Sequence, residues 1–123
     1  MKPRLVYVAG PFRSDSRWQE EQNIRAAESL GYEVAKLGAY PVIPHSNTRG
    51  YFSDAQPGEF FLDGILELMR RCDAVIFLPN WHDSTGAVGE HDEAERLGLP
   101  MFGCASGDGL RGLTIWLLAR GGA

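Results

Sequence analysis

Apolar and polar residues occur in blocks that predict strands and helices in alternation. A nearly continuous apolar run over Leu5–Ala9 is typical of a parallel strand that is buried on both faces. From about residue 16 to residue 37 the apolar positions follow helical spacing, and Gly38 is expected to cap that helix. The chain therefore begins with a strand and a long amphipathic helix.

The rest of the chain repeats this alternation. Further strands are predicted at residues 40–43, 73–78 and 98–102, and further helices at residues 59–71, 84–97 and 110–120. Residues 44–58 are rich in turn formers and are expected to form a long loop. This order predicts one α/β domain over residues 1–123, a flavodoxin-like (Rossmann-like) three-layer fold with a four- to five-stranded parallel sheet.

Composition excludes several classes of partner. A net charge of −4 and an isoelectric point near 5.3 argue against a nucleic acid or a membrane surface as the main partner. No apolar stretch is long enough to span a membrane, and the start of the chain lacks the pattern of a signal peptide. Cys72, in the apolar flank of a strand, is expected to be a buried free thiol, and a cytoplasmic location is expected.

Residues 84–90 carry the strongest candidate for catalysis. Ser84 or Thr85 is a natural helix N-cap, and Gly86 lets a substrate approach the main chain. Glu90 then lies near the start of the helix, where the helix dipole is expected to keep its carboxylate ionised. Such a carboxylate suits attack on an electrophilic carbon, for example the anomeric carbon of a sugar. The structural alternative is that Glu90 completes a capping box.

Three loops are expected to meet at the carboxyl edge of the sheet: residues 10–14, 44–51 and 79–90. The first of them contains Gly10, Pro11, Phe12, Arg13 and Ser14. It offers backbone donors, a guanidinium and a hydroxyl before a helix, an arrangement that often holds phosphate or another anion. A Gly-Pro turn with a solvated Arg13 is the alternative interpretation.

Several short motifs appear together in one order. They are Tyr7 to Phe12, Pro44-His45, Cys72 to Val75, and Ser84 with Gly86 and Glu90. Together they resemble the nucleoside 2-deoxyribosyltransferase superfamily, in particular its 2′-deoxynucleoside 5′-phosphate N-hydrolase branch and a set of short uncharacterised relatives. The resemblance implies that Glu90 is the nucleophile that attacks the sugar C1′ and expels the base.

The resemblance also implies roles for other residues. Tyr7 matches a first-strand tyrosine near the sugar, while Gly10 and Arg13 match the loop that holds the 5′-phosphate. Ser84 matches a phosphate contact where the transferases carry an aspartate, so the serine favours a nucleotide. Asp63 matches an aspartate that contacts or protonates the base.

Pro11 departs from the hydrolase pattern, which has a serine there. The proline lacks both that hydroxyl and a backbone N–H, and this weakens the inference of phosphate binding. The same Gly-Pro pair nevertheless resembles the uncharacterised relatives.

We therefore expect an enzyme, an N-glycosidase that acts on a (deoxy)nucleoside 5′-monophosphate without a cofactor. If a second base reaches the intermediate before water, the enzyme is a deoxyribosyltransferase. A non-catalytic nucleotide sensor on the same fold is the third reading. The predicted catalytic residues are Glu90, Asp63 and Tyr7, and the predicted substrate-binding residues are Gly10, Pro11, Phe12, Arg13, His45, Trp81, Asp83, Ser84 and Gly86.

Some of these residues have structural alternatives. Asp63, Asp83 and His45 are the candidates for the general acid that protonates the leaving base, yet each also suits an ordinary turn or helix surface. Trp81 is placed either to stack on a base or to cover the core.

Other features suggest no further chemistry. His82-Asp83 and His91-Asp92 match no known ligand spacing, so no metal is expected. Glu20, Glu21, Glu93 and Glu95 lie in helical charge patterns and are expected to be solvated. Trp116, in an apolar helix, lies in the core or in a subunit interface, and the resemblance to an oligomeric superfamily favours a homodimer or higher homo-oligomer.

Overall fold

Four parallel strands form the sheet of the computed structural model, which describes residues 2–51, 55–105 and 108–119. They are β1 (Leu5–Ala9), β2 (Tyr40–Val42), β3 (Ala74–Phe77) and β4 (Met101–Phe102), in the spatial order β2-β1-β3-β4. Within the sheet Leu5 pairs with Tyr40, Val6 with Ala74, and Val75 with Met101. The parallel sheet predicted from the apolar blocks is confirmed.

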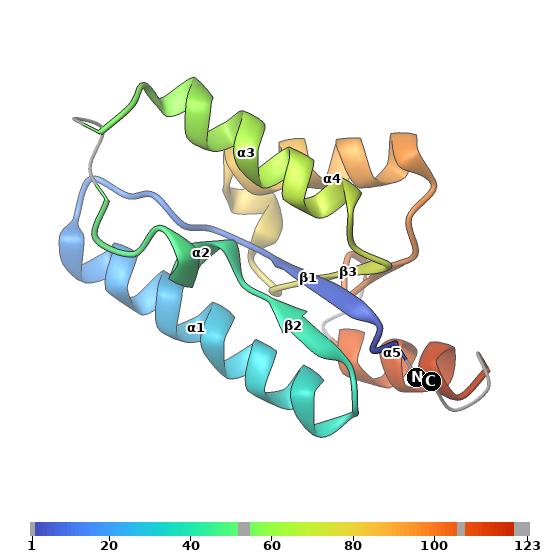
Figure 1. Cartoon of the computed structure of the whole chain (residues 1–123). Helices are drawn as coiled ribbons and strands as arrows, with labels where there is room; N and C mark the ends of the chain where they lie inside the picture. The colour runs from blue at the N-terminus through green and yellow to red at the C-terminus, as the bar shows by residue number, and fades with distance from the viewer. Residues whose placement is uncertain (1, 52–54, 106–107, 120–123) are drawn as a thin grey trace.

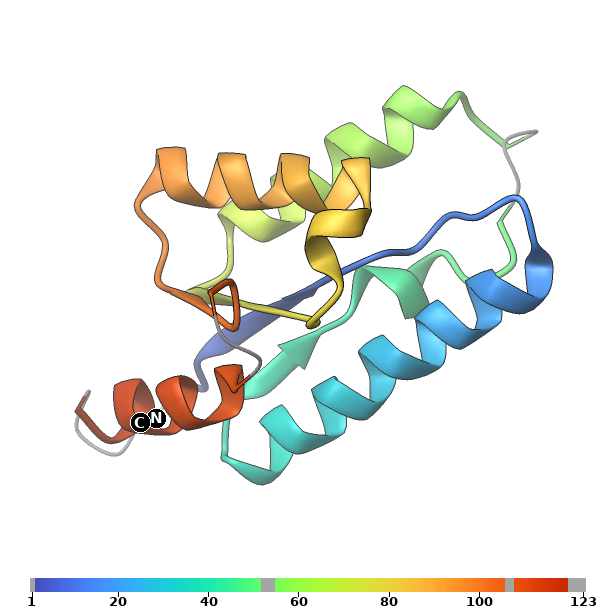
Figure 2. The same ribbon diagram turned by 180° about the vertical axis from the view of Figure 1, so that it is seen from behind.

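Helices cover both faces of this sheet. Helices α1 (Arg17–Lys36) and α5 (Gly109–Ala119) lie on one face, and α3 (Gly58–Arg70) and α4 (Thr85–Leu97) lie on the other (Figures 1 and 2). Each face has its own apolar cluster: Val6, Val8 and Leu113 belong to the first, and Met69 and Ala94 to the second. The three-layer α/β architecture predicted from the sequence is confirmed.

Serine side chains cap the starts of two helices, and the cap at Ser84 is one that the sequence predicts. The Ser16 side chain accepts the backbone N–H of Gln19 at the start of α1, and that of Ser84 accepts the N–H of Ala87 at the start of α4. Each serine satisfies one of the backbone donors that a helix start leaves without an intrahelical partner. The cap at Ser84 brings the first turn of α4 to the end of β3.

The structure corrects the expected elements in three places. A short helix, α2 (Pro44–Asn47), lies within the predicted loop, and a 3₁₀ turn, η1 (Trp81–Asp83), precedes α4. Both are too short to show a hydrophobic period, although Pro44 at the first helical position is a known starting signal. Strand β4 is shorter than the predicted residues 98–102 because Gly98 caps α4 in a left-handed conformation. The last predicted helical position, Arg120, lies outside the described residues.

Helix α5 contributes mainly to the core. Leu113 and Leu117 are buried against the sheet, and the Trp116 ring packs against Phe102 with 5.9 Å between ring centroids. Ile115 and Leu118 are exposed. Trp116 thus has core contacts, and the predicted homo-oligomer stays a prediction. Within the described part of the chain, no helix has the length and apolar character needed to cross a membrane.

The topology determines where a ligand site is expected. Strand β2 lies on one side of β1, and β3, the next strand along the chain, lies on the other side. The strand order therefore reverses between β1 and β3. In open α/β sheets the crevice at the carboxyl ends of such neighbouring strands is the usual binding place. The loops after β1 and β3 both begin at this edge.

Candidate functional site

A cleft of about 940 Å³ opens at this edge of the sheet. Its walls come from the β1–α1 loop, the first part of α1, helix α2, one face of α3, and the segment from η1 into α4. The predicted site residues that line it are Gly10, Pro11, Phe12, Arg13, His45, Asp83, Ser84, Gly86 and Glu90. Three sequence segments predicted to converge thus do meet around one cavity, whose size suits a small-molecule ligand.

Glu90 is a buried carboxyl group in the lining of this cleft. Only 3% of the residue is exposed, and its Oε2 atom accepts a hydrogen bond from the Tyr7 hydroxyl. Burial raises the pKa of Glu90 from 4.5 to about 7, although the hydrogen bond from Tyr7 acts in the opposite direction. The carboxylate is therefore poised between its two protonation states near neutral pH.

This geometry corrects two expectations about Glu90. The residue lies in the second turn of α4, where the effect of the helix dipole has faded. The effect of burial on the pKa is therefore larger than that of the dipole, and Glu90 is not fully ionised near neutral pH as expected. The capping box is also wrong, because Ala87 is the residue whose N–H bonds to Ser84, while Glu90 bonds to Tyr7 on β1. Glu90 joins α4 to the central strand.

Tyr7 lies beneath Glu90 rather than in the lining of the cleft. It is fully buried in the middle of β1, within the apolar cluster on the α3 and α4 side of the sheet. Burial, and secondly the nearby charge of Glu90, raise the pKa of Tyr7 well above its ordinary value. Its hydroxyl stays protonated and acts as a hydrogen-bond donor that orients the carboxylate.

Arg13 connects two walls of the cleft. Its Nη1 donates to the Tyr51 carbonyl over 3.1 Å, and its guanidinium carbon lies 4.6 Å from the centroid of the Phe12 ring and 5.8 Å from that of Phe61. Arg13 is exposed, as the alternative of a solvated side chain expects, but its guanidinium also makes these contacts. Cation–π and hydrogen-bond contacts hold the guanidinium in the lining of the cleft.

His45 supports the β1–α1 loop from α2. The residue is 1% exposed, and its Nε2 lies 2.9 Å from the Pro11 carbonyl, to which it donates. Burial lowers the pKa of His45, so the ring is neutral near pH 7 and Nδ1 is an acceptor. Nδ1 has no hydrogen-bond partner among the described residues. With its one N–H bound to Pro11, His45 is poorly suited to be the general acid.

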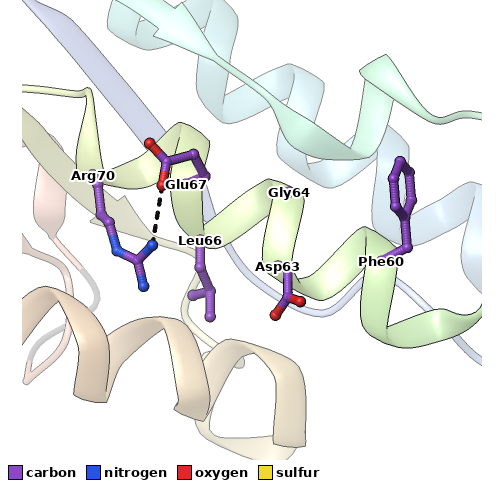
Figure 3. Close-up of a pocket in the computed structure, with 6 residues that line it drawn as sticks. All are labelled: Phe60, Asp63, Gly64, Leu66, Glu67 and Arg70. Atoms are coloured by element: carbon purple, nitrogen blue, oxygen red, sulfur yellow. Dashed lines mark hydrogen bonds and ion pairs between the residues drawn. The ribbon is translucent and has the colours of Figure 1, made fainter.

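Asp63 and Trp81 do not line the cleft. Asp63 is exposed, and together with Leu66 and Arg70 it lines a separate pocket on another side of α3 (Figure 3). Helical spacing explains this, because Phe61 and Ile65 of α3 face the cleft and Asp63 is two residues away from each.

The Trp81 ring stacks on His91, with 4.6 Å between centroids, and its Nε1 donates to the Cys104 carbonyl. It covers the sheet, in agreement with the structural alternative, and is not placed to stack on a ligand base.

Several residues in or beside the cleft were not predicted as site residues from the sequence. Asn23 is buried and its side-chain amide donates to the Phe12 carbonyl over 3.0 Å. Glu20, expected to be solvated, lines the cleft and accepts the Ser14 backbone N–H over 2.9 Å. Phe61 and Ile65 supply an apolar wall. The only signal in the sequence is the place of Asn23 and Glu20 in the first turns after the β1 loop.

The structure also bears on cysteine and metal chemistry. Cys72 is buried and free, as predicted, and burial raises the pKa of its thiol to about 11. Within the described parts of the chain, no three His, Cys, Asp or Glu side chains are grouped so that they could hold a metal ion.

Comparison with known proteins identifies a family. A family model described as a domain of unknown function (DUF7768) matches residues 4–103. The chain belongs to this DUF7768 family. The matched range includes β1 to β4 and every residue that lines the cleft. No curated protein matches the sequence of this DUF7768 member.

Among similar solved structures is a 2-deoxyribosyltransferase from the psychrotolerant bacterium Bacillus psychrosaccharolyticus. The TM-score is 0.57 and the identity 20%, over 80% of this DUF7768 chain and 69% of the other protein. At this identity the likeness shows a shared fold. The deoxyribosyltransferase-like fold implied by the sequence motifs is confirmed, while the hydrolase branch stays a prediction.

Proposed function

We propose that this protein cleaves the N-glycosidic bond of a nucleoside or a nucleoside 5′-monophosphate, with Glu90 as the nucleophile. The observation that carries the proposal is the buried Glu90 carboxyl group, oriented by Tyr7, in a cleft at the strand-order reversal. Removal from water raises the reactivity of a carboxylate toward an electrophilic carbon, and a donor such as Tyr7 keeps it in one orientation.

The reaction has two steps. A Glu90 carboxylate oxygen bonds to C1′ while the C1′–N bond breaks, and the electron pair leaves with the base, which takes up a proton. Water then attacks C1′, loses a proton, and displaces Glu90 as a carboxylate. Of the three candidate general acids, Asp83 is the one that both lines the cleft and lies exposed at its rim.

Transfer of the sugar to a second base is the second candidate function. It uses the same first step, but a free base instead of water attacks the glycosyl-enzyme. The cleft volume of about 940 Å³ leaves room for a base beside the sugar, and the similar fold of a 2-deoxyribosyltransferase supports this candidate.

The direct test is to follow base release by chromatography. The protein is incubated with deoxy- and ribonucleosides and their 5′-monophosphates, with and without a second free base. Release of free base supports hydrolysis, and formation of a new nucleoside supports transfer. If no substrate loses its base although one of them binds, the non-catalytic sensor replaces the enzyme.

Replacing Tyr7 by phenylalanine is expected to shift the pH dependence of base release to higher pH. The active form of Glu90 is ionised, so wild-type activity should fall as the pH drops below about 7. The lost hydrogen bond had lowered the pKa of Glu90, so the variant ionises at higher pH. At pH 7 we expect about tenfold slower release, because hydrogen bonds to charged groups contribute about 1.5–3 kcal/mol.

The measurement is the pH profile of kcat/KM for both proteins. The control is Tyr32→Phe, which removes a hydroxyl from a tyrosine that is 66% exposed on α1 and should leave the profile unchanged. A Tyr7→Phe profile that coincides with the wild type would contradict the role of this donor.

A further inference from the structure

We propose that Glu20 makes the cleft select substrates without a phosphate over their 5′-monophosphates. This inference rests on the proposed function, because it concerns the substrate class of the same cleft. It reverses the preference that Gly10, Arg13 and Ser84 suggested in the sequence. The reason lies in how the β1–α1 loop uses its own donors.

Glu20 places a carboxylate of the protein itself against the loop that was expected to hold a phosphate. Its Oε2 accepts the Ser14 backbone N–H over 2.9 Å, and the Ser14 hydroxyl in turn accepts the N–H of Ser16 over 3.2 Å. The Ser14 N–H is therefore not free to bind a phosphate. A bound phosphate would also have to approach the negative charge of Glu20, which lines the cleft.

Other groups of the loop and its neighbours are already engaged within the protein. Pro11 has no backbone N–H, and its carbonyl accepts from His45. The Asn23 amide donates to the Phe12 carbonyl, and Arg13 donates to the Tyr51 carbonyl. The side chain of this segment that offers acceptor oxygens to the cleft is the Glu20 carboxylate. Such acceptors suit hydroxyl groups and do not suit a phosphate dianion.

The charges around the cleft agree with this arrangement. Among its described lining residues Arg13 is the one permanent cation, whereas Glu20, Asp83 and Glu90 carry carboxyl groups. Three carboxyl groups thus share the cleft with one guanidinium. A neutral nucleoside avoids repulsion that a 5′-monophosphate would meet at every protonation state of Glu90.

The test compares 2′-deoxynucleosides with 5′-monophosphates of the same base. We measure kcat/KM for base release, and dissociation constants by calorimetry, on wild type, Glu20→Gln and Glu20→Ala. Glutamine removes the charge but keeps an acceptor for Ser14, and alanine also frees the Ser14 N–H. Glu21→Gln is the matched control, because Glu21 loses the same charge but pairs with Arg25 and Arg49 and does not line the cleft.

The wild type should favour the nucleoside at least about tenfold, the size expected of one charge repulsion near a protein surface. This ratio should fall about tenfold in Glu20→Gln, further in Glu20→Ala, and stay unchanged in Glu21→Gln. A loss of rate from general loop disorder would affect both substrates alike and leave the ratio unchanged, which contradicts the proposal.

The outcomes separate this inference from the proposed function. If 5′-monophosphates are cleaved faster than nucleosides, the selection by Glu20 is overturned and the N-glycosidase stands. If nothing is cleaved, the N-glycosidase is overturned. The ratio of the dissociation constants of the nucleoside and the 5′-monophosphate then shows whether Glu20 selects against phosphate. If neither class of compound binds, both proposals are overturned.

Discussion

Glu90→Gln is expected to abolish base release and, at the same time, to make the folded protein more stable above pH 7. The loss of rate should be about 10³-fold or more, because the amide cannot form the glycosyl-enzyme. The gain in stability follows from burial, which opposes the charged form of Glu90 but not an uncharged glutamine.

The pH window of this gain follows from the pKa of Glu90. The folded-state pKa is about 7 and the ordinary value is 4.5, so the folded protein binds this proton more tightly than the unfolded chain. Wild-type stability from this group is fully present below pH 4.5 and is lost as the pH rises through about 7. Glutamine does not titrate, and the free energy of unfolding of the variant should exceed that of the wild type by about 3 kcal/mol at pH 8.

Urea unfolding of both proteins at pH 5 and pH 8 measures this difference. The gain should be present at pH 8 and much smaller at pH 5. The control is Glu95→Gln, an exposed position on α4, for which neither base release nor stability should change. A Glu90→Gln protein that is less stable than the wild type at pH 8 would show that the carboxylate is not desolvated as the cleft implies.

Gly103→Ala is expected to cost about 3 kcal/mol or more of unfolding free energy. Gly103 follows β4 with a φ of +85°, which L residues rarely adopt. A Cβ atom there would lie 2.8 Å from the Phe77 carbonyl oxygen, a backbone atom of β3 that cannot move aside without disturbing the sheet. The backbone strain and the steric overlap therefore both add to the loss of unfolding free energy.

Gly98→Ala separates these two causes. Gly98 also has a positive φ, +71°, but a Cβ there would meet nothing within 4 Å. Its substitution should cost only about 1–2 kcal/mol, the conformational part alone. Urea unfolding of the two variants gives the comparison, and equal costs would mean that the close approach of Gly103 to β3 does not restrict the fold.

The strands and helices were largely predictable because they depend on periodic burial. The apolar run Leu5–Ala9 and the capping residue Ser84 are local signals, and the structure uses both as expected. Elements shorter than one hydrophobic period, α2 and η1, were missed because no pattern can develop over three or four residues.

The position of the candidate site could be predicted from the sequence, but which residues of each helix line the cleft could not. Loops that follow parallel strands must meet at one edge, so Gly10, His45 and Glu90 were expected together and do line one cleft. The side of a helix on which a residue lies depends on how that helix docks. Asp63 therefore fell outside the cleft and Glu20 inside it.

The sequence by itself determined the alternation of strands and helices, the parallel sheet, and Glu90 as the leading candidate for chemistry, because periodic burial and helix caps are local. Only the tertiary structure decided the protonation of Glu90 and the charge of the cleft. Both depend on distant partners: Tyr7 on β1 bonds to Glu90 on α4, and Glu20 reaches back to Ser14. Such desolvation and pairing exist only once the layers have packed.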